Sequence, residues 1–304
     1  MVKPDCSTAL AGINLKNPVV TASGTFGYGD EIADLVALNR LGGIVTKTIT
    51  LQPRKGNPPP RLAETPSGIL NAIGLQNVGL EAFINEKSAS LVKLPVPVIV
   101  SIAGESAGEY ASLASELTRR VKGIAGFELN LSCPNLEKTI IAQDPLCVRE
   151  IIKAVKKATP LTVIAKLSPQ VTSISQIAKA AQNAGADALA LVNTFPGMAI
   201  DITTWKPKIA NVTGGLSGPA VRPMALRCVW EVYKTVSLPI LAGGGISSWQ
   251  DAIEFFLAGA SAVSVGTANF IDPQAPVTIA EGITEYLRSL RIGSLKEIVG
   301  KLKA

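Results

Sequence analysis

Short apolar or β-branched runs alternate with helix-like stretches along the chain, and this alternation limits the possible folds more than any other feature. The predicted strands lie near Pro18–Ser23, Ile44–Lys47, Val98–Ile102, Phe127–Leu131, Val163–Leu167, Ala188–Asn193, Ile240–Ala242 and Ala262–Val265. The predicted helices lie near 30–40, 79–92, 106–122, 145–158, 173–184, 221–236, 248–259 and 274–291. A series of eight strand-then-helix units predicts a parallel (β/α)8 TIM barrel.

A doubly wound open sheet is the competing α/β architecture, but it does not naturally use so many units without a second domain. A TIM barrel takes about 250 residues plus insertions, so we expect residues 1–304 to form one barrel domain. Hydrophobic residues make up 47% of the chain and charged residues 17%. This composition favours an ordered aliphatic core. Asp30, and Ser247 with Ser248, are typical helix-start residues before two of the predicted helices.

Three connections, 48–78, 132–144 and 194–220, are too long to be simple turns. Each follows a predicted strand, so all three should rise from the carboxyl-terminal face of the barrel, where TIM-barrel active sites lie. Five prolines stiffen the first connection and indicate an ordered lid. Near the N-terminus, Leu10–Leu15 is typical of a small hairpin that could close the opposite end of the barrel.

Several functional classes are excluded by what the sequence lacks. The chain contains no histidine, which removes Ser–His triads and imidazole bases. The cysteines Cys6, Cys133, Cys147 and Cys228 form no C-x-x-C pair, so we expect free thiols and no metal site or cluster. No run of 18 apolar residues and no secretory leader is visible, so we expect a cytoplasmic protein with no membrane partner. The net charge of +6 comes from scattered residues, which favours an anionic small molecule over nucleic acid.

Polar residues stand at the ends of the predicted strands, where a barrel brings them together. They are Lys47, Asn130, Lys166, Asn193 and Thr194. Two lysines that end apolar strands indicate an anionic ligand, because a buried ammonium group needs a partner of opposite charge. The last two strands run into glycine-containing loops, 243–245 and 266–267. Loops after strands seven and eight of TIM barrels commonly bind phosphate through backbone N–H groups, so we predict a phosphate site there.

Cys133 follows the fourth predicted strand, among polar residues at the mouth of the barrel. Without a histidine nearby, its side chain should rest as a thiol near neutral pH. That suits a base working at alkaline pH better than an activated nucleophile. The residues alone leave base, nucleophile and bystander open.

Eight motifs, spread over essentially the whole chain, resemble those of one family, the class 1 dihydroorotate dehydrogenases. They are residues 21–27 (TASGTFG), 56–61 (GNPPPR), 71–77 (NAIGLQN), 130–135 (NLSCPN), 165–169 (AKLSP), 214–219 (GGLSGP) and the two glycine loops. The residues of these motifs are most similar to those of the 1B type. This resemblance implies one FMN per chain, the oxidation of dihydroorotate to orotate in UMP biosynthesis, and a homodimer within a heterotetramer. The second subunit would carry FAD and a 2Fe-2S cluster and pass electrons to NAD.

The resemblance also implies roles for individual residues. Cys133 matches the catalytic base that removes a C5 proton from dihydroorotate. The implied substrate-binding positions are Lys47, Asn71, Ala72, Ile73, Gly74, Leu75, Asn130, Asn193 and Thr194. The implied flavin-binding positions are Ser23, Lys47, Thr48, Ser101, Asn130, Lys166, Val192, Gly218, Gly244, Gly245, Gly266 and Thr267. Lys166 matches a lysine near the flavin N1–C2 edge, where a cation stabilises the anionic reduced ring.

Two stretches depart from the family pattern. Ser101 stands where an asparagine usually contacts FMN, which predicts a weaker contact at that point. Residues 136–141 lack the glycines common in the loop that covers the substrate, and this loop is shorter. The closure of that loop and the subtype are therefore open.

Four other functions remain to be weighed. A homodimer that reduces fumarate directly is the nearest alternative, and the presence of a second subunit would distinguish the two. A dihydropyrimidine dehydrogenase-like enzyme has a different sequence after its Cys-Pro. The tRNA dihydrouridine synthases carry a helical RNA-binding domain after the barrel, whereas this chain ends soon after the eighth predicted helix. A flavin-binding scaffold would have no use for Cys133.

Overall fold

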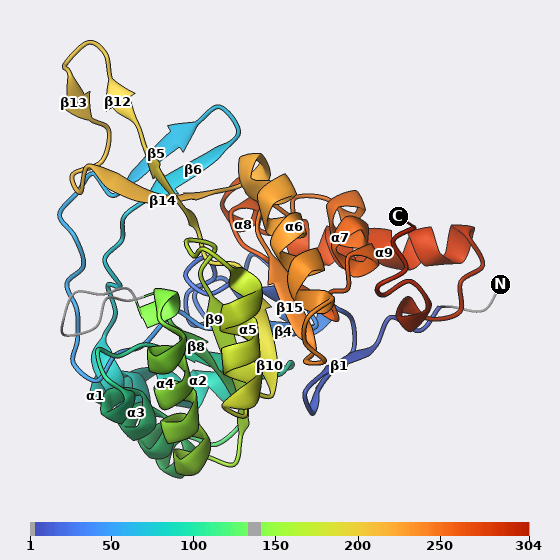
Figure 1. The fold of residues 1–304 in the computed structure, drawn as a ribbon, viewed down its shortest axis with the longest axis horizontal. Coiled ribbons are helices and arrows are strands. Elements are labelled where there is room, and N and C mark those ends of the chain that lie inside the picture. Colours follow the sequence, from blue (N-terminus) through green and yellow to red (C-terminus); the bar gives the residue numbers. More distant parts are fainter. Residues whose placement is uncertain (1–3, 133–140, 304) are drawn as a thin grey trace.

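A closed barrel of parallel strands forms the centre of the molecule (Figure 1). The computed structural model describes residues 4–132 and 141–303. The barrel strands are β3 (Val19–Thr21), β4 (Gly43–Val45), β7 (Val98–Ile102), β8 (Ile124–Asn130), β9 (Thr162–Leu167), β10 (Ala188–Leu191), β15 (Ile240–Gly243) and β16 (Ala262–Val265). They follow one another around the barrel in chain order, and β16 pairs with β3 to close it. Every predicted strand is one of these eight, so the predicted TIM barrel is confirmed.

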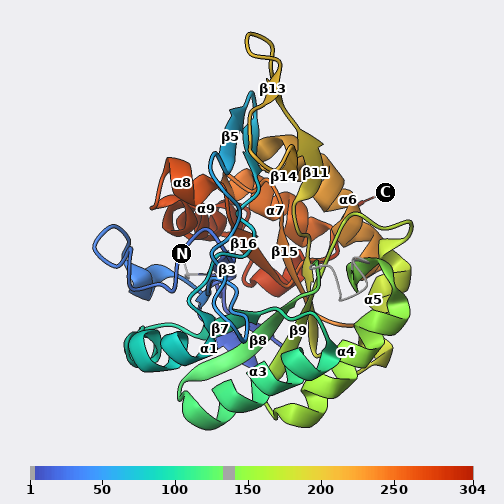
Figure 2. The ribbon, with the colours of Figure 1, turned by 90° about the vertical axis from the view of Figure 1, so that its left-hand side faces the viewer.

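Helices surround the barrel on its outside (Figure 2). They are α1 (Gly79–Ala82), α2 (Ser88–Leu91), α3 (Ala107–Arg120), α4 (Pro145–Ala158), α5 (Ile174–Asn183), α6 (Arg222–Tyr233), α7 (Trp249–Leu257), α8 (Ala268–Ile271) and α9 (Ala275–Ser289). A π-helical turn, Phe83–Lys87, joins α1 to α2. Ser248 caps α7, and its side chain and that of Asp251 form a reciprocal capping box. In residues 4–132 and 141–303, none of the helices combines the length and apolar character that a membrane span requires.

The predicted helix at 30–40 is wrong. This segment forms turns and a single 3-10 turn at Leu38–Arg40. Its buried side chains, Val36 and Leu38, pack with the following Leu41 and with Phe26 in a small separate core. Positions 36, 38 and 41 do not share one face of an α-helix. Burying all three therefore requires a less regular backbone.

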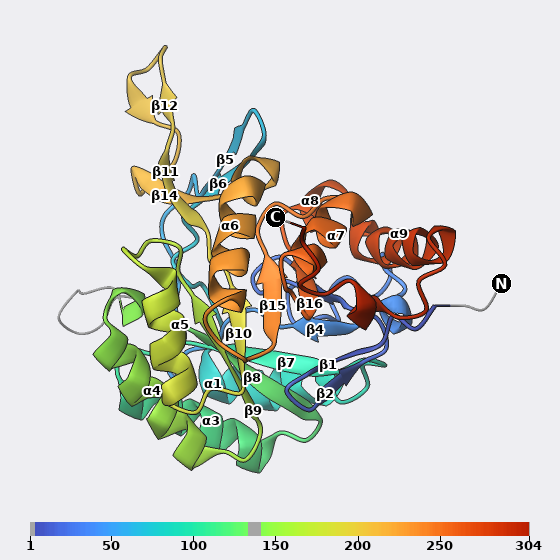
Figure 3. The same ribbon diagram turned by 45° about the vertical axis from the view of Figure 1, so that its right-hand side comes forward.

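An apolar plug closes the amino-terminal end of the barrel. The predicted hairpin near Leu10–Leu15 is present as β1 (Thr8–Leu10) and β2 (Ile13–Leu15), which pair antiparallel. Leu10, Ile13 and Leu15 are buried against one inward-facing layer of the barrel. That layer consists of Val20, Val45, Ile99, Ile164, Ala188, Ala190, Leu241 and Ala262. Figure 3 shows the hairpin lying across the strands at this end.

Two of the long connections meet at the opposite end. The connection 48–78 contains β5 (Leu62–Thr65) and β6 (Gly68–Asn71), and the connection 194–220 contains β11 (Phe195–Met198) and β14 (Thr213–Ser217). Together they form a four-stranded antiparallel sheet in the order β11-β14-β6-β5. The first connection is thus ordered, as its prolines predicted, but strand pairing with a distant segment also holds it.

A small hairpin, β12 (Ile200–Asp201) and β13 (Lys206–Pro207), extends beyond this sheet and is the most protruding part of the chain in Figure 1. Its tip exposes large apolar side chains, with Ile202 85% and Trp205 88% exposed. The third long connection, 132–144, lies mostly outside the described residues and ends in a 3-10 turn at Ile141–Gln143.

Candidate active site

The interior of the barrel changes from apolar to polar within two residues along three adjacent strands. Ile99 and Ile164 belong to the apolar layer, and Gly126 holds the corresponding place on β8. Side chains on a strand alternate between the two faces, so the next inward positions are two residues further on. Those positions are Ser101, Glu128 and Lys166. The carboxyl-terminal half of the barrel interior therefore contains charged and hydroxyl groups.

These polar side chains form a continuous hydrogen-bonded chain. Oγ of Ser101 donates to Oε1 of Glu128 at 3.1 Å, and Nζ of Lys166 lies 3.4 Å from the same oxygen. Oγ1 of Thr48 is 2.9 Å from Oγ of Ser101, and Oγ of Ser23 is 3.2 Å from Oγ1 of Thr48. Because the single hydroxyl proton of Ser101 goes to Glu128, Thr48 donates to Ser101. The polar chain thus runs from β3 to β9 across the barrel mouth.

Asn130 and Asn193 lie beside this chain. Nδ2 of Asn130 is 3.4 Å from Oγ1 of Thr48, and Nδ2 of Asn193 donates to Oδ1 of Asn130 at 3.2 Å. Nδ2 of Asn193 also lies 2.7 Å from Oγ of Ser132. Oδ1 of Asn193 accepts from the backbone N–H of Thr194 at 2.8 Å. Amide groups with donors and acceptors suit a flat ligand that carries amide edges.

The loop at 71–75 reaches the same region through the antiparallel sheet. Asn71 donates from Nδ2 to the carbonyl of Gly215 at 3.0 Å. Gly215 faces Thr194 so closely that any side chain at 215 would collide with the Thr194 hydroxyl. The loop is held by Asn57, whose N–H donates to the carbonyl of Ile73 and whose Nδ2 donates to that of Ala72. The predicted substrate-binding residues at 71–75 and at 193–194 are therefore neighbours in space.

Lys47 lies just beyond β4 and is partly buried. Burial lowers the pKa of its ammonium group below the ordinary value of 10.5, and the nearby Arg61 lowers that pKa further. The carboxylate of Glu31 opposes both effects. A desolvated cation beside a second cation gains free energy when an anion binds. This electrostatic setting is what a site for a carboxylate ligand requires.

The two glycine loops and Gly218 form a second part of the site. Oγ1 of Thr267 donates to Oγ of Ser217 at 2.8 Å, which ties the loop after β16 to β14. Gly218 has a φ of +100° and lies so close to Gly68 that a Cβ would approach its Cα to 2.6 Å. Gly244, with a φ of +124°, lies beside Ala225 and Val192. Backbone conformation and close packing thus both require glycine at 218 and 244.

These loops suit a phosphate group, and the polar chain suits a flavin ring. Within the described residues, the backbone N–H groups of Gly244, Gly245, Gly266 and Thr267 donate no hydrogen bond to another residue. The short helix α8, which the sequence did not predict, begins directly after this loop. Free N–H groups at such a place bind phosphate. Lys166 and the hydroxyl and amide groups supply the partners that the oxygen and nitrogen atoms of a flavin need.

Cys133, the predicted base, lies outside the described residues, so its position stays a prediction. Its neighbour Ser132, the last described residue before it, contacts Asn193 at the mouth of the barrel. Glu128 is the residue that the sequence reasoning missed. It is the only charged residue in the strand Ile124–Asn130 and shares a face with Asn130, two positions on. That spacing was the available signal.

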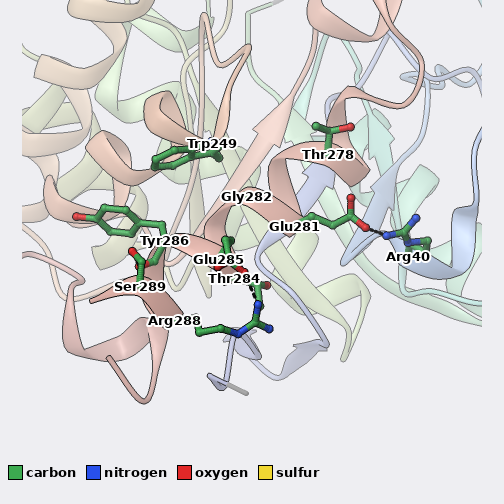
Figure 4. A pocket seen from close by; sticks show the side chains of 10 residues that line it. All are labelled: Arg40, Trp249, Thr278, Glu281, Gly282, Thr284, Glu285, Tyr286, Arg288 and Ser289. Atoms are coloured by element: carbon green, nitrogen blue, oxygen red, sulfur yellow. Dashed lines mark hydrogen bonds and ion pairs between the residues drawn. The ribbon is translucent and has the colours of Figure 1, made fainter. Parts of the chain in front are cut away.

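A surface hollow lies along helix α9, away from the predicted site residues (Figure 4). Its lining includes the ion pairs Arg40–Glu281 and Arg288–Glu285, together with Trp249. None of the predicted site residues lines it. The barrel mouth is therefore the better candidate for chemistry.

Comparison with known proteins identifies the family. The family model for dihydroorotate dehydrogenase matches residues 6–287. The chain belongs to the dihydroorotate dehydrogenase family. It is 54% identical over 297 residues to a protein of Endomicrobium trichonymphae, covering 98% of this chain and 97% of that protein. It is 52% identical over 305 residues to one of Geotalea daltonii, covering 100% of both chains. It is also 52% identical over 301 residues to one of Desulforudis audaxviator, covering 98% of both.

All three relatives are named dihydroorotate dehydrogenase B (NAD(+)), catalytic subunit. The resemblance to the class 1B members of the family, drawn from the motifs, is therefore confirmed.

Proposed function

We propose that this chain is the catalytic subunit of an NAD-linked dihydroorotate dehydrogenase, which oxidises dihydroorotate to orotate through FMN in UMP biosynthesis. One observation carries the proposal. The barrel mouth combines a desolvated lysine, Lys47, and the polar chain that ends at Lys166 with the loop at 71–75 and two glycine loops whose N–H groups are free. This arrangement suits an anionic substrate next to a phosphate-bearing redox cofactor.

The substrate loses a proton from C5 and a hydride from C6, which creates the ring double bond. Cys133 takes the proton as the catalytic base. Bound FMN supplies the chemistry of hydride acceptance. A cysteine thiol acts as a base only after it ionises, so proton removal becomes faster as the pH rises toward the thiol pKa.

The binding roles divide between the two parts of the site. Lys47 neutralises the substrate carboxylate, and the backbone of Asn71, Ala72, Ile73, Gly74 and Leu75 borders the substrate. Asn130, Asn193 and Thr194 hydrogen-bond the pyrimidine ring. For the flavin, Ser23, Thr48, Ser101, Lys166 and Val192 border the ring, and Gly218, Gly244, Gly245, Gly266 and Thr267 hold the phosphate.

The relatives' names, which describe a catalytic subunit linked to NAD(+), support the assembly that we propose. Residues 1–304 form one FMN-binding domain, and two copies form a homodimer inside a heterotetramer. The partner subunit carries FAD and a 2Fe-2S cluster and passes electrons to NAD in the cytoplasm. A homodimer that reduces fumarate directly is the competing possibility. NAD-linked turnover that appears only after the partner is added supports the first assembly.

Anaerobic mixing of the purified FMN-loaded protein with dihydroorotate tests the activity. We expect the flavin absorbance to bleach within seconds and orotate to form. The same protein mixed with fumarate after bleaching distinguishes the two acceptors, because only the fumarate-linked type should recover its colour. A flavin that stays oxidised with dihydroorotate, both alone and with the partner subunit, would contradict the proposed function.

A further inference from the structure

A carboxylate buried within the barrel interior is the feature that the proposed function does not use. The side chain of Glu128 is only 3% exposed. It projects from β8 between Ser101 on β7 and Lys166 on β9, and the same oxygen, Oε1, contacts both. A charged group at such a place costs several kcal/mol of desolvation unless partners compensate it.

We propose that Glu128 is a positioning residue that fixes Lys166 and sets the reduction potential of the bound flavin through it. This inference rests on the proposed function, because it requires Lys166 to lie beside the flavin. Glu128 itself is assigned no contact with the flavin, but it touches two residues that border the ring, Lys166 and Ser101.

The surroundings of Lys166 support this role. Its side chain is 15% exposed, and Glu128 is the carboxylate with which it forms an ion pair. A lysine has a flexible stem and a point charge, so its ammonium group needs a fixed partner to hold one position. Ser101 restrains Glu128 in turn through a hydrogen bond of 3.1 Å, and Thr48 holds Ser101 through one of 2.9 Å. The position of the cation is thereby tied to strands β7 and β8.

The charges of Glu128 and Lys166 determine the direction in which a substitution shifts the reduction potential of the flavin. A carboxylate 3.4 Å from an ammonium group offsets much of its field in a site of low dielectric constant. Glu128→Gln removes that negative charge and keeps the size of the side chain. The field of Lys166 then favours the anionic reduced flavin more strongly, so the potential rises.

Ser101→Ala should shift the reduction potential in the opposite direction. This substitution leaves both charges in place and removes the hydroxyl that donates to Oε1 of Glu128. The carboxylate of Glu128 then interacts with Lys166 alone and offsets the field of Lys166 more completely. The reduction potential of the flavin therefore falls. A general loosening of the site would move both variants in the same direction.

The experiment is an equilibrium titration of the FMN-loaded protein against a reference dye, without dihydroorotate. We expect Glu128→Gln to raise the equilibrium constant for flavin reduction by about tenfold, which is about 30 mV for a two-electron couple. In the background of Lys166→Gln, the same substitution should change the constant by less than about twofold. Ser101→Ala should lower the constant.

Asp187→Asn is the matched control. Asp187 forms an ion pair with Lys156 at 2.7 Å just before β10, at the amino-terminal end of the barrel, and it should leave the potential unchanged. An unchanged potential in Glu128→Gln, or a rise in Ser101→Ala, would overturn the inference. So would an equal shift in the Lys166→Gln background, because Glu128 would then act without Lys166. If Lys166→Gln binds FMN too weakly to titrate, the shift in Glu128→Gln decides, and a fall or no change in the reduction potential overturns the inference. A wild-type protein that binds no FMN would instead contradict the proposed function.

Discussion

The two ends of the barrel are built from the same strands but have opposite character. At the amino-terminal end, inward-facing aliphatic side chains pack against Leu10, Ile13 and Leu15 of the hairpin. At the carboxyl-terminal end, the next inward positions on three of these strands are Ser101, Glu128 and Lys166. A shift of two residues along the strand is enough to pass from one environment to the other.

This difference separates stability from chemistry. Aliphatic layers bury apolar area and stabilise the fold, since each fully buried side chain contributes about 1.5–3 kcal/mol. Polar layers cost desolvation and are tolerated where hydrogen bonds or a ligand compensate them. Substitutions at the apolar end should therefore change stability without changing the chemistry. Substitutions at the polar end should change the chemistry without changing stability.

The largest effect on the chemistry is expected from Cys133→Ala, which removes the predicted base. Loss of a general base slows the catalysed step by about 10²–10⁴-fold. We expect flavin reduction by dihydroorotate to fall by at least this factor while FMN stays bound, as measured by anaerobic stopped-flow absorbance. Wild-type reduction rates in this variant would remove Cys133 from the mechanism and weaken the contrast between the two ends.

At the apolar end, Leu10→Ala should break folding and spare the chemistry. Leu10 is fully buried in the plug, and such a truncation costs about 2–5 kcal/mol. Urea denaturation should show this loss of unfolding free energy, whereas the potential of the bound flavin should not move. Leu146→Ala is the control, because Leu146 is exposed on α4 and should change stability by less than about 0.5 kcal/mol. An unfolding free energy in Leu10→Ala that matches the wild type would show that the plug does not carry stability.

Lys47→Ala should change ligand binding without unfolding the barrel. It removes a desolvated, charge-assisted contact worth about 1.5–3 kcal/mol. Orotate affinity should therefore fall by more than about tenfold in isothermal titration calorimetry. Lys153→Ala, at an exposed position on α4, serves as the control and should bind orotate normally. An unchanged titration for Lys47→Ala would count against the substrate site.

The pH dependence of orotate binding sharpens the same comparison with a more gradual effect. Burial lowers the pKa of Lys47 below 10.5. Only the protonated form attracts the carboxylate, so affinity is highest below this pKa and falls as the pH rises through it. We expect the fall to begin below pH 10.5, by up to about tenfold per unit. Lys47→Arg, which keeps its charge at these pH values, should not show the fall. If orotate affinity still fell with rising pH in Lys47→Arg, the fall would belong to another titrating group.

Much of the fold followed from local patterns. Mostly apolar runs of three to six residues marked all the barrel strands, because a strand covered on both faces is apolar along most of its length. The helices with a clear apolar stripe, such as α4 and α9, also lay where they were predicted. The segment at 30–40 misled the prediction because its composition suits a helix, while burial of Val36, Leu38 and Leu41 requires turns.

The candidate site also contains residues that the sequence predicted and contacts that it could not predict. Strand ends and glycine loops pointed to Lys47, Asn130, Lys166 and the phosphate loops, since a barrel brings strand ends together whatever their distance in sequence. The contact between Asn71 and Gly215 could not be read from the chain, because it depends on two long connections pairing as strands.

The sequence by itself therefore determined the barrel, its family and the residue types at its mouth. These depend on alternation along a strand and on motifs that lie within a few residues. Only the tertiary structure decided which polar groups touch. Glu128 was read as part of an apolar strand until its neighbours on β7 and β9 showed it between Ser101 and Lys166. The physical reason is that alternation gives the face of a strand on which a residue lies, whereas the tilt and register between strands set its neighbours.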